Sequence, residues 1–473
     1  MHNDPQIAPS KARRKCIFHT RYSEIMIKKF KAFNSFSWVA MALPVIFAMA
    51  DSDGASSPDL PFMTAGAKEA GITGIPGAPA RDADEAAPKW RLLRTFKHPC
   101  PVAQGIFFKD DTRILTRSYD DKVRTWSPAT GQVIGPVLTH DGFVRGAVFS
   151  RDERKILTWS MDKTARLWDA ETGKQIGPSL MHDDDVFGAE FSRDERRILT
   201  WSEDKTARLW DAETGKQIGR SFTQNGSVLS AIFSKDERRI LTCGKDSTAR
   251  LWDVATGKQI APAFRHDSYA RGAIFSTDEK RILTWSWDKT ARLWDCATGR
   301  QIGRSLTHDG EVNGAVFSKN GAKILTWSAD KTARLWDGAT GRQIGPSLTH
   351  NDFVNAAAFS RDETKILTCS VDNTARLWNV ETGKQIGPSL SHHASVTGVS
   401  FSKDESRILT FSIDNTVRVW DAATGRQLGW NLTHDHDVNG AIFSKDETKI
   451  LTWSYDNTAR LWDVSGKEFL PER

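Results

Sequence analysis

The stretch THDGFVRGAVFSRDERKILTWSMDKTARLWDAETGKQIGPSL, Thr139–Leu180, is one copy of a 42-residue unit that decides the fold. It contains four short apolar or alternating runs, at residues 144–149, 155–159, 164–168 and 174–180. Each run is bounded by turn residues, and none reaches ten residues before a Gly or an Asp/Ser cluster interrupts it, which argues against helices. The unit therefore predicts four short strands joined by tight turns, in an antiparallel meander.

The unit recurs along the chain without an insertion or a deletion. A period of about 40–45 residues is typical of architectures in which each repeat needs its neighbours to complete a core. Because adjacent residues such as Thr158 and Trp159 point to opposite faces of a strand, both faces need cover. Blades stacked in a closed ring provide that cover and leave only short edges. One tryptophan marks each copy at the same phase: Trp126, Trp168, Trp210, Trp252, Trp294, Trp336, Trp378, Trp420 and Trp462.

Over about residues 90–470 the chain resembles the WD-repeat (tryptophan–aspartate repeat) propellers. Leu-Trp-Asp ends the third run of most units, and a His, a Thr and an Asp precede the Trp at constant spacing. The resemblance implies a buried tetrad in which the indole N–H donates to the Thr hydroxyl, the hydroxyl to the imidazole and the imidazole to the carboxylate. The implied tetrads are His140, Thr158, Asp162, Trp168; His182, Thr200, Asp204, Trp210; His266, Thr284, Asp288, Trp294; His308, Thr326, Asp330, Trp336; His350, Thr368, Asp372, Trp378; His392, Thr410, Asp414, Trp420; and His434, Thr452, Asp456, Trp462.

Two of the nine units need separate treatment. The first fits the tetrad pattern at His98, Thr116, Asp120 and Trp126, although Thr and Ser flank its Trp in place of Leu and Asp. In the fourth, Gln224 occupies the position of the His. An amide cannot complete the same relay of hydrogen bonds, so we expect the blade that contains Gln224 to be locally weaker than its neighbours.

These observations predict an all-β fold, a β-propeller of four-stranded antiparallel blades made from nine WD repeats. Nine blades are preferred because the spacing shows no break at which a smaller ring would end. A leading strand at Trp90–Phe96 aligns with the outer strand of a unit and could close the ring against the last blade, a place for which the tail Lys467–Leu470 competes. The alternative is a ring of seven or eight blades with extra repeats.

Residues 1–50 are typical of a signal peptide. Lys28, Lys29 and Lys31 precede an apolar run over 36–47, and Ala48-Met49-Ala50 offers a cleavage site before Asp51. The run is too short to span a bilayer comfortably. We therefore expect an exported, bacterial-type member of the family, periplasmic or secreted after cleavage near Ala50. An uncleaved leader that anchors the chain in a membrane is the alternative, and the start can be Met1 or Met26.

The remaining chain divides into a linker and the propeller. Residues 51–89 are rich in Gly, Pro, Ala and Asp and predict a flexible linker, while 90–473 form the propeller. The formal charge of the whole chain is +6, and residues 1–50 alone hold eight Lys/Arg against two Asp/Glu. The mature chain is thus near neutral, which gives no support to nucleic-acid binding.

The histidine usage argues against catalysis. Of twelve histidines, two precede the cleavage site, eight fill tetrad positions, and only His393 and His436 remain. No set of free histidines is left for a metal or for a nucleophile pair. The run His182–Asp185 has three carboxylates but neither the Gly nor the distal Glu of a calcium loop. We therefore expect a non-enzymatic protein with no metal and no cofactor.

Positions that differ between units are the candidates for function, since every loop has the same length. Two such positions are the fifth residue after each tetrad His and the residue before each tetrad Asp. The resemblance implies that both look toward the face where partners dock, where aromatic residues and Arg are the usual anchors. The candidate partner-binding residues are Arg145, Phe187, Arg271, Trp287 and Tyr455.

These residues predict a non-enzymatic protein–protein interaction scaffold whose protein partner remains unidentified. Contact with a membrane is expected only through an uncleaved leader. The alternative is a propeller that binds a small ligand or a metal in its central channel, with or without catalysis.

Three columns that recur in the units carry further expectations. The Arg two residues before each tetrad Trp, such as Arg166, is expected to be structural, as a pairing partner or as a stem along the Trp. Charged turns such as Arg193–Arg196 are expected to be solvated loops. Cys243 and Cys369 occupy the column of Trp159 three blades apart, too far from each other for a disulfide.

Overall fold

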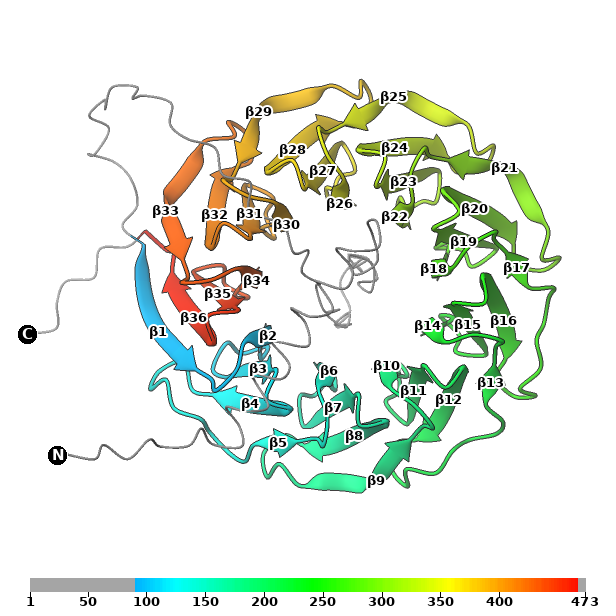
Figure 1. Cartoon of the computed structure of the whole chain (residues 1–473), viewed down its shortest axis with the longest axis horizontal. Helices are drawn as coiled ribbons and strands as arrows, with labels where there is room; N and C mark the ends of the chain where they lie inside the picture. Colours follow the sequence, from blue (N-terminus) through cyan, green and yellow to red (C-terminus); the bar gives the residue numbers. More distant parts are fainter. Residues whose placement is uncertain (1–89, 467–473) are drawn as a thin grey trace, which may run out of the picture.

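The computed structural model describes residues 90–466, and in this range the chain forms nine four-stranded antiparallel sheets and no helix. The sheets stand as blades around one axis (Figure 1). The nine-bladed propeller expected from the repeat is thus confirmed. The predicted leader, residues 1–50, the predicted linker, 51–89, and the tail Lys467–Leu470 lie outside the described residues. Within 90–466 no helix is long and apolar enough to cross a membrane.

The strands take four places in each blade. The inner strands, nearest the axis in Figure 1, are β2 (Val102–Phe107), β6 (Val144–Phe149), β10 (Val186–Phe191), β14 (Val228–Phe233), β18 (Ala270–Phe275), β22 (Val312–Phe317), β26 (Val354–Phe359), β30 (Val396–Phe401) and β34 (Val438–Phe443). The second strands are β3 (Ile114–Ser118), β7 (Lys155–Ser160), β11 (Arg197–Ser202), β15 (Arg239–Gly244), β19 (Arg281–Ser286), β23 (Lys323–Ser328), β27 (Lys365–Ser370), β31 (Arg407–Ser412) and β35 (Lys449–Ser454).

The outer half of each blade holds the remaining strands. The third strands are β4 (Lys122–Trp126), β8 (Thr164–Asp169), β12 (Thr206–Asp211), β16 (Thr248–Asp253), β20 (Thr290–Asp295), β24 (Thr332–Asp337), β28 (Thr374–Asn379), β32 (Thr416–Asp421) and β36 (Thr458–Asp463). The outer strands are β5 (Leu138–Thr139), β9 (Gln175–Met181), β13 (Phe222–Thr223), β17 (Phe264–Arg265), β21 (Gln301–Thr307), β25 (Gln343–Thr349), β29 (Gln385–Ser391), β33 (Gln427–Thr433) and β1 (Arg91–Lys97). Blade 1 is β2–β5, the others follow in order, and blade 9 joins β34–β36 to β1.

The ring closes through its first strand. β1 pairs antiparallel with β36, from Arg91 opposite Asp463 to Lys97 opposite Thr458, and so becomes the outer strand of the last blade (Figure 1). The first and the last parts of the repeat array are thereby held in one sheet, as expected for a leading strand. Because all nine blades belong to this one ring, the alternative of a smaller ring with extra repeats is wrong.

The blades pack on one another through the column that begins with Trp159. This side chain is 3% exposed and shares a cluster with Val186 and Ile198 of the next blade. A Cβ on Gly146, its cross-strand partner, would lie 2.1 Å from the Trp159 ring, so the large side chain needs glycine opposite. Where Cys replaces Trp, the glycine is also replaced. The two pairs are Ser230 opposite Cys243 and Ala356 opposite Cys369. The two cysteines are therefore buried parts of the packing between blades.

The charged turns between the inner and second strands are not simply solvated loops, which corrects the expectation for turns such as Arg193–Arg196. In eight of the nine blades a carboxylate of this turn accepts the backbone N–H of the preceding blade's turn, and in blade 6 Gly321 takes its position; Glu153 Oε1, for example, accepts from Lys109 N at 2.7 Å. This bond ties neighbouring blades together, and Asp111 repeats it across the ring closure by accepting from Lys445 N at 3.0 Å. The other pairs are Glu195 with Arg151, Glu237 with Arg193, Glu279 with Lys235, Glu363 with Lys319, Glu405 with Arg361 and Glu447 with Lys403.

Candidate binding rim

Each inner strand begins with a β-bulge that fixes the direction of one side chain. In blade 2 the pairing register shifts between Val144 and Gly146, so Arg145 between them has no partner on β7. Bulges re-aim side chains and are common beside functional sites. The bulge residue is the fifth after the tetrad His, one of the two positions singled out in the sequence. The nine bulge residues are Ala103, Arg145, Phe187, Leu229, Arg271, Asn313, Asn355, Thr397 and Asn439.

The loop before each inner strand and the turn after each second strand meet on the same face. In blade 2 the backbone N–H of Met161, just before the tetrad Asp, donates to the carbonyl of Phe143 at 2.9 Å. In blade 5 the N–H of Trp287 donates to the carbonyl of Tyr269 at 3.3 Å. Three residues per blade therefore lie close together here: the bulge residue, the residue two before it, and the residue before the tetrad Asp. We call this set of positions the rim.

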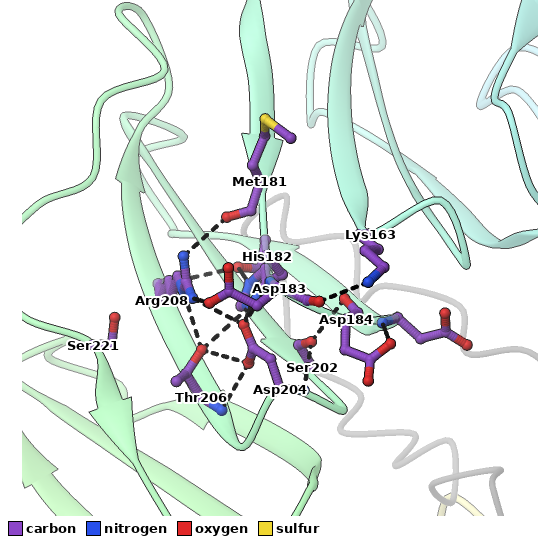
Figure 2. Close-up of polar contacts among 12 residues, drawn as sticks. Lys163, Met181, His182, Asp183, Asp184, Ser202, Asp204, Thr206, Arg208 and Ser221 are labelled. Carbon is purple, nitrogen blue, oxygen red and sulfur yellow. Dashed lines mark hydrogen bonds and ion pairs between the residues drawn. The ribbon is translucent and has the colours of Figure 1, made fainter.

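The tetrad joins the strands of a blade to the loop that leads to the rim; Figure 2 shows its His182 and Asp204 in blade 3. In blade 3 the Trp210 indole N–H donates to the Thr200 hydroxyl at 2.8 Å, and this hydroxyl lies 2.7 Å from His182 Nε2. His182 Nδ1 lies 2.8 Å from Asp204 Oδ2. Burial lowers the pKa of His182, so the neutral ring accepts at Nε2 and donates from Nδ1. One relay thus joins the third strand, the second strand and the loop that leads to the rim.

The same hydrogen bonds recur in seven blades. In each, the imidazole lies 2.8–2.9 Å from the carboxylate and 2.7 Å from the Thr hydroxyl. In the seven blades the indole donates to Thr at 2.8–2.9 Å. These are the blades whose residues were expected to form tetrads, from His140 in blade 2 to His434 in blade 9. The rim is therefore supported in nearly the same way in these seven blades.

Two further residues of each repeat complete the network: the Arg represented by Arg208 and the Thr represented by Thr206. The first was identified from the sequence and the second was missed. Arg208 donates from Nη2 to Asp204 at 2.9 Å and from Nη1 to the Met181 carbonyl at 3.1 Å (Figure 2). Its Nε donates to the Thr206 hydroxyl at 3.1 Å, and this hydroxyl in turn donates to Asp204. The arginine column is thus a pairing partner, one of the two structural roles expected for it. The Thr column was missed, although Thr, or Lys in blade 1, precedes Ala/Val-Arg in every unit.

Blades 1 and 4 depart from this pattern. In blade 1 Asp120 pairs with Arg124 at 2.5 Å, and His98 makes no hydrogen bond to it, so the tetrad expected there is incomplete. In blade 4 Gln224 donates to Asp246 at 3.2 Å, but its Oε1 is buried without a partner. The indole of Trp252 still donates to Thr242 at 2.8 Å. The relay in blade 4 is therefore broken between Thr242 and Gln224.

The rim residues expected to bind a partner fall into three groups. Arg145 pairs with Asp185 at 3.0 Å and lies 4.8 Å from the Phe187 ring centroid. Arg271 lies 5.0 Å from the Trp287 ring. The Tyr455 hydroxyl lies 3.2 Å from the hydroxyl of Tyr119. The structure thus brings the five residues together as two Arg–aromatic pairs and one tyrosine that is joined to blade 1.

Comparison with known proteins gives the family. Residues 101–379 match the family model described as the first β-propeller of IFT122, and residues 384–421 and 427–463 match the model of the WD domain, G-beta repeat. The chain belongs to the IFT122-type family of WD40 β-propellers. The crystal structure of the computationally designed protein Ika8 is similar, with 22% sequence identity and a TM-score of 0.55. The aligned region covers 69% of this chain and 97% of the Ika8 chain. This likeness concerns the fold alone. No curated protein matches the sequence.

The rim of this WD40 propeller is uneven around the ring. Apart from Phe353 of blade 7, the aromatic and cationic side chains of the rim lie from blade 9 through blade 1 to blade 5. Those of blades 9 to 4 are in contact across blades; Tyr119, for example, stacks on Phe143 at 4.6 Å. In blades 6 and 7 the bulge residues are Asn313 and Asn355, whose amides donate to the carbonyls of the next inner strand at 3.0 and 2.9 Å. These amides serve the junction between blades. The side of the ring with aromatic and cationic groups is therefore the candidate site.

Phe143 and Tyr269 were missed as candidates by the sequence reasoning. Both lie two residues before a bulge residue, a position that varies between units as much as the bulge position itself. Tyr269 is 40% exposed and its ring packs 5.4 Å from Trp287. The variation of this third column between units was the signal that could have identified them.

The rim of the WD40 propeller offers hydrogen-bond donors and aromatic surface more than metal ligands. In residues 90–466 no group of three His, Cys, Asp or Glu side chains is placed to hold a metal ion. The two histidines outside the tetrad positions, His393 and His436, are exposed. His436 Nδ1 lies 3.4 Å from Asp437. The chemistry available at the rim is that of recognition by stacking, cation–π contact and charge.

Proposed function

We propose that this WD40 propeller is a non-enzymatic scaffold that binds a protein partner at its rim. The observation that carries the proposal is the contrast between the positions that repeat in the blades and the rim positions, which differ from blade to blade. The inner three strands of each blade and the turns between them are nearly uniform around the ring and the tetrads recur in seven blades, whereas the rim differs from blade to blade and gathers most of its aromatic and cationic groups on one side. WD40 propellers typically serve as protein-interaction scaffolds, and aromatic and Arg residues are the usual anchors of interfaces.

Affinity capture with purified propeller tests the proposal. We expect the wild-type chain to retain a partner that the double variant Arg271→Gln/Trp287→Ala loses. The matched control is Trp430→Ala, because Trp430 is 67% exposed on the outer strand β33 and therefore on a different surface. A partner lost with Trp430→Ala and retained by the rim variant would place binding at the circumference and contradict the proposal.

We also propose that the chain acts outside the cytoplasm, as its N-terminal sequence suggests, and that it does not bind nucleic acid. N-terminal sequencing of the native protein is expected to give a start near Asp51. A chain that starts at Met1 or Met26 and sediments with membranes would favour the uncleaved anchor. Metal analysis of the purified protein tests the alternative function. A stoichiometric metal together with an unchanged partner list for the rim variant would favour the propeller that binds a ligand in its channel.

A further inference from the structure

Arg271 differs from the other polar bulge residues in lacking a partner for its head group. Arg145 pairs with Asp185, the three asparagines donate to carbonyls, and the Thr397 hydroxyl donates to the Phe411 carbonyl at 3.3 Å. The Arg271 side chain makes no hydrogen bond or ion pair with any residue in 90–466. Its guanidinium lies over the Trp287 ring, which is a cation–π contact. Its donors are therefore free to bind a ligand.

The side chains of the two bulge arginines point toward different blades, because each guanidinium lies over a different aromatic ring. Arg145 lies over Phe187, which belongs to the next blade, and this places it beside Asp185 of that blade. Arg271 lies over Trp287 of its own blade. The next blade offers it Asn313 in place of an aromatic ring, and Glu311 at the position that corresponds to Asp185 forms no ion pair with it in the described chain.

The surroundings of Arg271 make an unpaired guanidinium costly. Burial lowers the pKa of Arg271 to about 10, which still leaves it protonated at neutral pH. Burial also raises the pKa of Glu311, with Arg271 and Lys289 acting in the opposite direction. A desolvated charge without a hydrogen-bonded counter-ion is unfavourable, and an arriving anion would relieve it. The planar guanidinium matches a carboxylate in bidentate geometry.

We propose that Arg271 binds a side-chain carboxylate of an acidic peptide segment, with Trp287 and Tyr269 as the flanking aromatic surface. This inference rests on the proposed function and names the chemistry of the partner. The Arg145–Asp185 pair is the internal template, since there the chain supplies the Asp from its own next blade. Glu311 beside the site favours a singly charged carboxylate over a phosphate dianion, because a second negative charge on the ligand increases the repulsion.

Protein labelled with ¹⁵N on its tryptophans allows this site to be observed directly by NMR. The indole N–H signal of Trp287 is assigned with Trp287→Phe, and the other indole signals report whether each variant is folded. The probe is a tetra-aspartate peptide with blocked ends, and tetra-asparagine with blocked ends is its uncharged control. We expect the Trp287 signal to move and saturate with tetra-aspartate and to remain in place with tetra-asparagine.

Three variants separate the site from a general attraction of charge. Arg271→Gln is expected to weaken binding of tetra-aspartate at least about tenfold, whereas Arg145→Gln leaves it within about twofold because that guanidinium is already paired. Glu311→Gln is expected to strengthen binding, since it removes the neighbouring negative charge. Absence of a shift in the wild-type protein, equal weakening in both arginine variants, or weaker binding in Glu311→Gln would overturn the proposal.

Two further ligands test the chemical class. A blocked phosphoserine peptide that binds more tightly than tetra-aspartate would overturn the choice of a carboxylate. N-acetylalanine, whose carboxylate is that of a chain end, is expected to bind more weakly than tetra-aspartate, and equal or stronger binding would overturn the assignment to a side chain. The titrations and the capture of a partner test different proposals. If tetra-aspartate does not bind but a partner is still captured at the rim, the carboxylate site is wrong and the proposed function stands. If tetra-aspartate binds but no partner is captured at the rim, the proposed function fails.

Discussion

The junction of blades 2 and 3 and that of blades 4 and 5 are built from the same repeat, yet they differ in how fully their polar groups are paired. At the first, the relays of His140 and His182 are complete and Arg145 has Asp185. In blades 4 and 5, Gln224 of blade 4 leaves the relay broken, and Arg271 of blade 5 has no counter-ion in the described chain, even from blade 6, where Glu311 stands in the position that corresponds to Asp185. Where one repeat lacks a hydrogen bond or an ion pair that the neighbouring repeats have, a functional role or a loss of stability is expected. The second junction is thus the more informative surface.

The largest expected effect is the loss of a tetrad carboxylate, and it differs between the two junctions. Asp204→Ala in blade 3 should lower the free energy of unfolding by about 4 kcal/mol, because it leaves a buried imidazole N–H without an acceptor and removes the buried carboxylate that pairs with Arg208. Asp246→Ala in blade 4 should cost about 1 kcal/mol less, since Gln224 still donates to Thr248.

Urea unfolding of the two variants measures this difference. The control is Asp183→Ala, which removes an acid that is 87% exposed and should change the free energy of unfolding by less than about 0.5 kcal/mol. Equal losses for Asp204→Ala and Asp246→Ala would show that the complete relay adds nothing to blade 3.

Glu190 lies at the boundary between the two junctions and makes stability depend on pH. It occupies a position that is apolar in most blades, accepts the Phe233 N–H at 3.0 Å, and burial raises its pKa to about 8. A raised carboxyl pKa means that its contribution to stability is fully present below about 4.5, its ordinary value, and is lost as the pH rises toward about 8.

Glu190→Gln should therefore match the wild type near pH 4 and exceed it above pH 8 by on the order of 3 kcal/mol. Thermal unfolding across this pH range checks the sign. A stability difference that does not change with pH would show that Glu190 is ionised or solvated in the native blade.

The next effect repairs blade 4. Gln224→His should raise the free energy of unfolding by about 1.5 kcal/mol, because the imidazole can join Thr242 to Asp246 as in the neighbouring blades. In the wild-type protein we expect faster amide exchange in β15 than in β11, and in the variant the two strands should become similar. Equal protection of β11 and β15 before the change would contradict a weak blade 4.

The period of 42 residues sufficed to predict nine blades as the preferred ring and to offer the leading strand Trp90–Phe96 as a candidate for closing it, because each unit repeats the same strands and turns. The details that it could not predict depend on contacts between different blades. Glu153 reads as a solvated turn residue until the next blade's backbone is placed beside it. Arg145 and Arg271 point in different directions because Phe187 of the next blade lies near the first and Trp287 of its own blade lies near the second. The residue spacing within one unit does not show which ring an arginine will contact.

The smallest expected effect compares the two arginines themselves. Arg145→Gln should lower the free energy of unfolding by about 1 kcal/mol, since it breaks a largely buried ion pair with Asp185. Arg271→Gln should leave it unchanged or raise it slightly, because it removes a desolvated charge that has no hydrogen-bonded counter-ion in the described chain. Guanidinium unfolding of both variants measures the difference, and a larger loss for Arg271→Gln would mean that this residue serves the fold.

Hydrogen exchange of the propeller with and without its captured partner tests the account most directly. We predict slower exchange on binding in the loops and bulges around Phe143–Arg145 and Tyr269–Arg271, with no change in the outer strand β33 or in the turns around Arg193–Arg196. Slower exchange in those turns or in β33, with the rim unchanged, would contradict the assignment of function to the rim.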